Sequence, residues 1–433
     1  MAAEEATGWA DLRWGPWPDD AVIPASELDE RTRAARDLPR SIAAVRGDGV
    51  VQRQVFDPAL QQYSRAMRAG EPQFASADVG ERWHAARRQA VDHVLTAVAG
   101  SRWAGHLVLR GSTLLRAWYG ALAREPGDVD FVVTPPTWDL DERRTQDVFT
   151  AIARGTRDAG AGSDVRIDAA GVLEDEIWTY DRIPGRRMVL PWRAEGLPSG
   201  SVQVDFVFNE RMPCEPEFTD VPRADGTGAH RLLAATRAQS LAWKVMWLLT
   251  DTHPQGKDLY DAALLARDES AGAALVHESL VADEASWAGV RLTRAMVSGI
   301  GTDWEEFAKE YPRWALDPEG LLDTLVAGLE PVFAREDGPP VDGYALRRRW
   351  LAGHVEACRA QAARGGVDAV LGYLDAHGMR LTESVVVVCE VVGPDRCSRE
   401  QAVELITGAS AHARDARNAA GVSRALSALR EQV

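Results

Sequence analysis

The chain has 433 residues, of which 45% are hydrophobic, and this length predicts two or three domains rather than one core. No stretch approaches the ~20 apolar residues that span a bilayer, and the N-terminus lacks a basic start with an apolar run, so we expect a cytoplasmic protein without a membrane partner. The net charge of −16 argues against broad non-specific attraction to nucleic acid, but it leaves room for a local basic groove.

Residues 1–100 are expected to form an N-terminal arm and a helical buttress. The first thirty residues are rich in proline and tryptophan, with Trp9, Trp14 and Trp17. They predict an irregular arm that packs on the body through its indoles. From Ser26 to Gly100 the pattern is mainly helical, and the stretch A-R-R-Q-A-V-D-H-V-L-T-A-V-A leads into the next element.

Residues 101–270 are expected to form the core, and its first element is a strand, a turn and a helix. The segment H-L-V-L-R (106–110) is short and β-prone, Gly111-Ser112 breaks it, and the following T-L-L-R-A-W-Y-G has helical spacing. A helix that begins at such a turn presents free N–H groups and a positive dipole end, which suits a phosphate. The simpler interpretation is that Ser112 merely caps the helix.

Acidic residues follow on two further predicted strands. In D-V-D-F-V-V the period of two places Asp128 and Asp130 on one face, and V-Q-V-D-F-V-F isolates Asp205 among apolar residues. An adjacent strand could therefore add a third carboxylate, and three carboxylates beside a phosphate require a hard cation, Mg²⁺ or Mn²⁺. Alternatively, Asp128 and Asp130 are ordinary turn and edge-strand acids after Pro126-Gly127.

The Asp205 strand is predicted to end a β-meander. Between Val165 and Phe208 the strand-like segments are V-R-I-D, E-I-W-T-Y-D-R-I, R-R-M-V-L-P-W-R and S-V-Q-V-D-F-V-F. Pro184-Gly185 is the expected turn between the second and third of them.

Beyond Arg231 the pattern is helical again. Lys244 lies at the edge of the apolar face of one predicted helix, so we expect it to point inward, although a lysine can also keep its amine in water. Asp258 and Asp261 share a face of the next helix. The simpler interpretation of Asp258 is an acid near the helix N-terminus that interacts with the helix dipole. Residues 271–335 predict a helical region packed on the core, and residues 341–433 predict a helical segment of unknown role after a break at Glu336-Asp337-Gly338-Pro339-Pro340.

These pieces, in this order, resemble the AbiEii/AbiGii-type nucleotidyltransferase toxins of the DNA polymerase beta-like superfamily. The similarity lies in R-G-S-T-L-L-R-A-W-Y-G, A-R-E-P-G-D-V-D-F, the Asp205 strand, S-L-A-W-K-V-M-W-L-L and K-D-L-Y-D, and it spans Arg110 to Asp261. The family often has Gly-Gly-Thr or a Ser near the position of Pro126, and the interval from the lysine to Lys-Asp carries T-H-P-Q here, which leaves the nucleotide open.

The resemblance implies an α/β fold, with a small mixed sheet flanked by helices and largely helical extensions. It implies transfer of a nucleoside monophosphate from an NTP to a hydroxyl, in a toxin–antitoxin or abortive-infection (phage-defence) system. The 3′ end of tRNA is the implied acceptor, and a cognate antitoxin is a further implied partner. The expected catalytic residues are Asp128, Asp130, Asp205, Lys244 and Asp258, the first three as metal ligands, and the expected nucleotide-binding residues are Arg110, Gly111, Ser112, Arg124 and Lys257.

Other interpretations stay open. Arg110 and Arg124 could form ion pairs with Glu125 or another local acid instead of binding phosphate. The acceptor could be a small molecule such as an aminoglycoside, or a protein hydroxyl, if the cleft beside Asp205 is acidic and narrow. The chain could also be an inert nucleotide-binding or scaffold module, although an idle site has no physical need for three charged groups. Short basic runs could contact RNA or form ion pairs: Arg87-Arg88, Arg143-Arg144, Arg186-Arg187 and Arg347-Arg348-Arg349.

Overall fold

The computed structural model describes residues 8–12, 21–179, 183–268, 272–314, 317–336, 341–409 and 419–433. Trp14, Trp17 and most of the predicted break at 336–340 lie outside these ranges. Trp9 is buried in a small cluster with Leu12, Ile23, Leu38 and Met67, and its indole N–H donates to the Ser26 carbonyl. This part of the arm therefore packs on the body.

A mixed sheet organises the core, as predicted. Its strands are β5 (Leu107–Arg110), β6 (Asp128–Val133), β7 (Val165–Ile167), β8 (Leu173–Thr179), β9 (Ile183–Ala194), β10 (Gly200–Val207), β11 (Glu217–Pro222) and β12 (Ala229–Ala234). Their order is β11-β12-β5-β6-β10-β9-β7, and β8 pairs with β9 beside β7. The pairs β6/β10 and β5/β12 are parallel, and the others are antiparallel.

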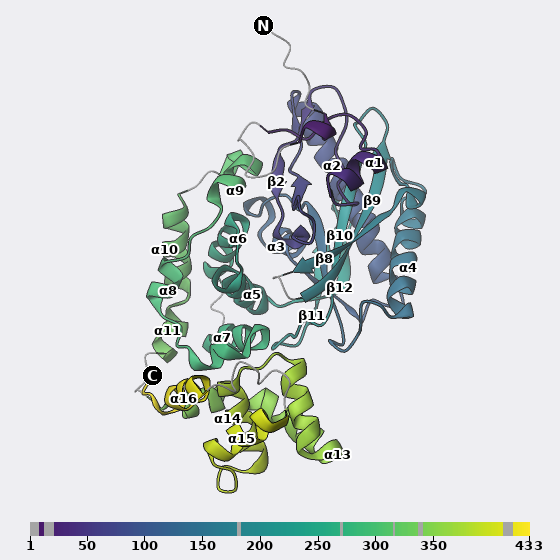
Figure 1. Cartoon of the computed structure of the whole chain (residues 1–433). Coiled ribbons are helices and arrows are strands. Elements are labelled where there is room, and N and C mark those ends of the chain that lie inside the picture. The colour runs from purple at the N-terminus through teal and green to yellow at the C-terminus, as the bar shows by residue number, and fades with distance from the viewer. Residues whose placement is uncertain are drawn as a thin grey trace.

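Helices cover both faces of this sheet. Figure 1 shows α4 (Arg143–Ala159) on one side and α5 (Arg237–Thr250) with α6 (Gly256–Ala266) on the other. On the α4 side Phe131 and Phe206 stack, and Phe149 of α4 packs on Phe206 with ring centroids 5.0 Å apart. Because side chains alternate along a strand, the residues before and after these phenylalanines face the opposite side. That side carries Asp130 and Asp205.

The N-terminal region contains less helix than the sequence pattern predicts. Before the long α2 (Ala77–Ala99) the described residues form α1 (Glu30–Ala35), two single-turn 3-10 helices (Trp9–Asp11 and Pro58–Leu60) and two short antiparallel strand pairs. The paired strands are β1 (Val50–Val51) with β4 (Gln73–Phe74), and β2 (Gln54–Phe56) with β3 (Met67–Ala69). The expected helical buttress is thus α2, and the prediction missed the strands because two or three residues show no periodicity.

Two further details of the sheet differ from expectation. The predicted Pro184-Gly185 turn is wrong: both residues lie in β9, where they pair with Trp178 and Ile177 of β8. Pro184 is the second residue of β9, and a proline so near the start of a strand removes only one potential ladder hydrogen bond. The hairpin of β11 and β12 was not predicted; β12 pairs with β5, and β11 forms this edge of the sheet.

The rest of the chain is helical. The elements are α3 (Ser112–Tyr119), α7 (Ala273–Asp283), α8 (Arg294–Ser298), α9 (Trp304–Glu310), α10 (Pro318–Gly328), α11 (Glu330–Glu336), α12 (Gly343–Trp350), α13 (Ala352–Ala376), α14 (Leu381–Val392), α15 (Arg399–Ala409) and α16 (Ala419–Arg430). The C-terminal helices bury a second apolar cluster together with Val281 of α7, and they gather away from the sheet in Figure 1. The predicted domain boundaries remain predictions. None of the described helices is long and apolar enough to cross a membrane.

Candidate active site

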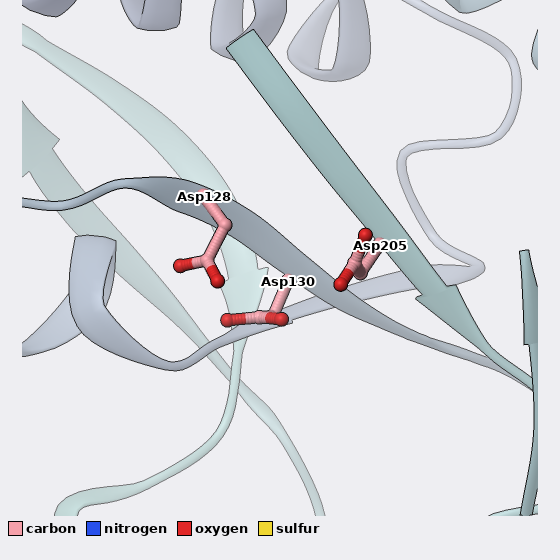
Figure 2. A group of neighbouring side chains, drawn as sticks. All are labelled: Asp128, Asp130 and Asp205. Carbon is pink, nitrogen blue, oxygen red and sulfur yellow. The ribbon is translucent and has the colours of Figure 1, made fainter. Parts of the chain in front are cut away.

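Three carboxylates meet at the junction of β6 and β10. Asp205 is the register partner of Asp130 in the parallel pair, and Asp128 lies two residues before Asp130 on the same face. One oxygen from each of these aspartates lies within 4.8 Å of the others, and Figure 2 shows all three side chains turned toward a common space. Three buried or half-buried oxygen donors at this separation suit a hard divalent cation.

The Gly111-Ser112 turn lies directly against this group. Gly111 has a φ of 77°, and a Cβ on it would overlap the Asp130 carboxylate, so only glycine fits here. The Ser112 hydroxyl donates to Asp128 Oδ1 at 3.1 Å and does not cap the helix. The turn and the aspartates are therefore one constellation, with the N-terminus of α3 directed at it.

Burial and mutual repulsion make this constellation costly without a cation. Burial, followed by the charges of Asp128 and Asp205, raises the pKa of Asp130 to about 8. Burial also raises the pKa of Asp205, and the nearby Arg187 only partly offsets it. At Asp128 the positive charges of Lys257 and Arg124 outweigh burial and lower the pKa. A bound divalent cation would relieve the repulsion that the Asp130 value records.

The raised pKa of Asp130 predicts that the response of the protein to Mg²⁺ depends on pH. The folded, metal-free protein holds a proton on Asp130 that the unfolded chain releases near pH 4, so its stability falls as pH rises toward 8. A cation needs the ionised carboxylate, so its affinity should fall by roughly tenfold for each pH unit below 8. We expect MgCl₂ to raise the melting temperature clearly at pH 8.5 and little at pH 6, against NaCl of equal ionic strength. Equal shifts at both pH values would contradict the three-carboxylate site.

A second buried network fixes Lys244 behind the aspartates. Its amine donates to Asp258 at 2.6 Å, lies 3.1 Å from Asp261 and sits over the Trp247 ring. Burial opposes its charge, but Asp258 and Asp261 outweigh burial and hold the pKa of Lys244 above its usual value. Lys244 thus points inward as expected.

Arg124 belongs to the same network. It forms a two-pronged ion pair with Asp261 and donates to the Tyr311 hydroxyl at 3.4 Å. Its acidic partner is therefore Asp261 of α6 rather than the neighbouring Glu125, which pairs with Arg88. Asp261 was not among the predicted site residues, yet it joins two of them.

Arg187 and Asp57 are further site residues that sequence reasoning did not select. The Arg187 guanidinium donates to both oxygens of Asp205, at 3.0 and 2.9 Å, and to Asp57 at 2.8 Å. Arg187 and Asp205 are register partners on β9 and β10, so the pairing follows from the sheet. The alternation of side chains along a strand could have identified Arg187, because it lies on the same strand face as the apolar Val189 and therefore points inward.

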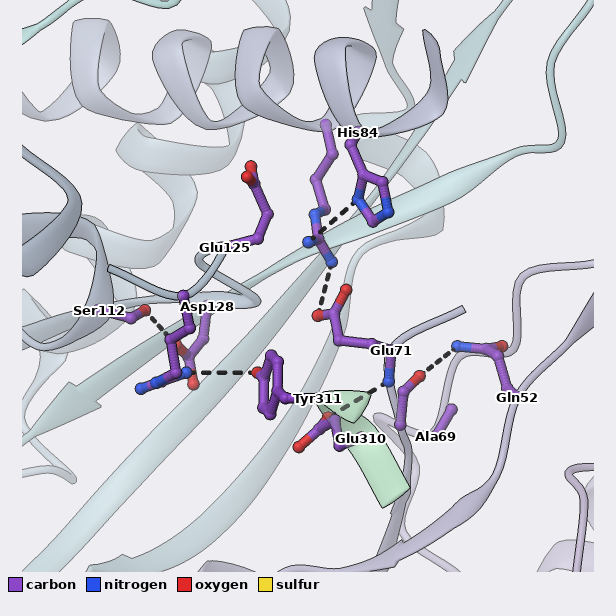
Figure 3. Close-up of polar contacts among 12 residues, drawn as sticks. Gln52, Ala69, Glu71, His84, Ser112, Glu125, Asp128, Glu310 and Tyr311 are labelled. Atoms are coloured by element: carbon purple, nitrogen blue, oxygen red, sulfur yellow. Dashed lines mark hydrogen bonds and ion pairs between the residues drawn. The ribbon is translucent and has the colours of Figure 1, made fainter. Parts of the chain in front are cut away.

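The N-terminal strands close over this region and are held by ion pairs. Arg68 of β3 binds both oxygens of Glu310 in α9, at 2.6 and 2.8 Å, and the Glu71 amide donates to Glu310 as well. Figure 3 shows the Glu71–Glu310 contact, with Tyr311 beside Glu310 and the Ser112–Asp128 hydrogen bond nearby. Residues far apart in sequence therefore share one polar wall.

One cavity contains all of the predicted site residues. It is lined by Arg110, Gly111, Ser112, Arg124, Asp128, Asp130, Asp205, Lys244, Lys257 and Asp258, together with Asp57, Arg68, Trp178 and Arg187. A second cavity continues from it between the N-terminal strands and the sheet, and both share Arg68, Arg124, Asp128, Arg187, Gln203 and Lys257. The aspartates are thus accessible along a cleft rather than enclosed.

The two remaining cations of the cleft differ. Arg110 is buried, pairs with Glu210 at 2.6 Å and lies over the rings of Trp243 and Trp247. Lys257 is half-buried, and among the described residues it forms no ion pair within 4.0 Å. Lys257 is therefore the cation most available to a bound anion.

Most of the short basic runs form ion pairs. Arg87 pairs with Glu71, Arg186 with Glu174 and Glu176, and Arg347 with Glu383. Their charges are compensated inside the protein, as the ion-pair interpretation expected. A broad basic surface for nucleic acid does not follow from them.

A Gly-Ser turn at a helix start faces an Asp-x-Asp strand and a third aspartate on the next strand, which is the arrangement that the resemblance to nucleotidyltransferases implied. A family model for the nucleotidyl transferase AbiEii toxin of type IV toxin–antitoxin systems matches residues 93–328, and the chain belongs to this family. The match includes the strands that carry the aspartates and the helices that carry Lys244 and Asp258. A comparison with curated proteins finds no significant match.

Proposed function

We propose that the protein transfers a nucleoside monophosphate from an NTP to a hydroxyl acceptor in a Mg²⁺- or Mn²⁺-dependent reaction. The observation that carries this proposal is the meeting of Asp128, Asp130 and Asp205 within 4.8 Å, against the Gly111-Ser112 turn. A bound divalent cation would neutralise the charge between these carboxylates and the phosphates. The three aspartates fit such a cation because they offer hard oxygen donors and repel one another without it.

The surrounding residues have distinct proposed roles. The N–H groups at the start of α3, with Ser112, bind the triphosphate, and Lys257 supplies a free positive charge beside it. Lys244, which Asp258 orients, and Arg110 line the same cavity and stabilise charge on the departing phosphates. The acceptor oxygen attacks the α-phosphorus, the bond to the β-phosphate oxygen breaks, and pyrophosphate leaves. We assign Asp205 the role of receiving the acceptor proton.

The proposed biological role is that of the toxin in a type IV toxin–antitoxin or abortive-infection system, with a cognate antitoxin as partner. This role follows from family membership. We propose the 3′ end of tRNA as the acceptor. Lys257 supports a phosphate-bearing acceptor over a cationic one such as an aminoglycoside, because it lines both cavities beside Asp128 and forms no ion pair among the described residues.

The test is incubation of the protein with each α-labelled NTP, Mg²⁺ and total tRNA. We expect label in tRNA with the wild-type protein, none with the Asp128→Ala/Asp130→Ala variant, and none with tRNA whose 3′ diol has been oxidised by periodate. Label in a small molecule or in protein would keep the transfer reaction and reject tRNA. NTP binding without transfer to any acceptor would contradict the enzymatic proposal and favour a binding module.

A further inference from the structure

The catalytic cavity has an aromatic residue at its rim that the phosphate chemistry does not use. Trp178, near the end of β8, lines the cavity that contains the three aspartates and Lys257. It is 41% exposed, and it is the only tryptophan in the described ranges that is exposed rather than buried or half-buried. An exposed indole that lines a functional cleft offers a large, rigid apolar face that a ligand can cover.

No contact within the described residues accounts for this side chain. Its backbone pairs with Pro184 of β9, but the ring has no aromatic, cation–π or hydrogen-bond partner there. The cavity is lined by one other tryptophan, Trp247, which is 8% exposed. The charged groups of Lys244 and Arg110 lie over its ring in cation–π contacts. Trp178 is therefore the aromatic surface in this cavity that is free to receive a ligand.

We propose that Trp178 is a stacking platform for a nucleobase, either that of the incoming NTP or that of the acceptor's terminal nucleotide. This inference rests on the proposed function. The phosphates of an NTP belong at the polar end of the cavity, with Gly111, Ser112 and Lys257, so its base must lie against another part of the lining. An indole face binds any base through its π-system, which provides affinity without selecting one nucleotide.

The experiment compares Trp178→Ala and Trp178→Phe with the wild-type protein in calorimetric titrations with each of the four NTPs and Mg²⁺, without acceptor. We expect Trp178→Ala to weaken binding of every NTP by about tenfold, and Trp178→Phe to retain most of it, since phenylalanine still stacks. Inorganic tripolyphosphate, which has phosphates but no base, should bind all three proteins equally. A purely structural role would weaken tripolyphosphate binding too.

The matched control is Phe218→Ala. Phe218 is 60% exposed on β11, at the opposite edge of the sheet, and lines neither cavity of the cleft. The Phe218→Ala substitution should leave the binding constants of all NTPs and of tripolyphosphate unchanged. A second assay titrates the acceptor at saturating NTP: a higher KM for acceptor in Trp178→Ala, with unchanged NTP binding, assigns the platform to the acceptor's base.

The outcomes separate this inference from the function on which it rests. If wild-type protein transfers label, and Trp178→Ala matches it in NTP binding and in acceptor KM, the platform is wrong and the transferase stands. If wild-type protein binds neither NTP nor tripolyphosphate, both proposals are overturned. Melting temperatures of the three proteins should agree closely, because the side chain is exposed.

Discussion

Replacing Asp130 with asparagine should abolish nucleotidyl transfer while leaving the fold intact. The loss of one carboxylate removes a cation ligand, and cation stabilisation of the transition state amounts to several kcal/mol, so we expect the rate to fall by about 10³-fold or more. Because Asp130 lies against Gly111 and between Asp128 and Asp205, asparagine keeps the shape of the site and removes only charge.

The same substitution should have the opposite effect on stability. In the metal-free wild-type protein at pH 8.5, Asp130 is ionised against its raised pKa of about 8, and asparagine avoids that repulsion. The variant should therefore melt at the same or a higher temperature in EDTA, and Mg²⁺ should no longer raise that temperature. Transfer above one hundredth of the wild-type rate would contradict the role of Asp130 as a cation ligand. A large drop in melting temperature would show that Asp130 is a structural residue.

Replacing Asp261 with asparagine should produce the largest loss of stability in the site region. Asp261 is fully buried between Arg124 and Lys244, and these two cations outweigh burial and lower its pKa. Without the carboxylate both cations stay buried with too little compensation. Removal of one partner from a buried ion pair costs about 3–5 kcal/mol, so urea unfolding should show a decrease of that size in the free energy of unfolding.

Two further variants make this result specific. Asp323→Ala removes an exposed carboxylate from α10 and should change the free energy of unfolding by less than about 0.5 kcal/mol. Arg124→Met should destabilise the wild-type protein more than it destabilises Asp261→Asn, because the pair is already broken in the latter. Additive effects of the two substitutions would argue against the Arg124–Asp261 pair.

The local spacing of apolar and charged residues correctly predicted the strands and helices that carry the site. Alternation placed Asp128 and Asp130 on one strand face, and the Gly-Ser break located the start of α3, because both features depend on neighbouring residues alone. The two helices that carry Lys244 and Asp258 were found from their apolar spacing. By contrast, the short N-terminal strands and the Pro184-Gly185 segment were misassigned, since their conformation depends on distant partners.

The sequence by itself determined the chemistry available to this protein: an Asp-x-Asp strand, a third aspartate, a phosphate-type turn and an inward lysine, in the order of a known family. Only the tertiary structure decided how they combine. The register of β6 with β10 joined Asp205 to Asp130, and charge pairing across the core joined Arg187 to Asp57 and Lys244 to Asp261. Such partners are selected because a buried charge requires an opposite charge nearby, and no local periodicity encodes which distant residue will supply it.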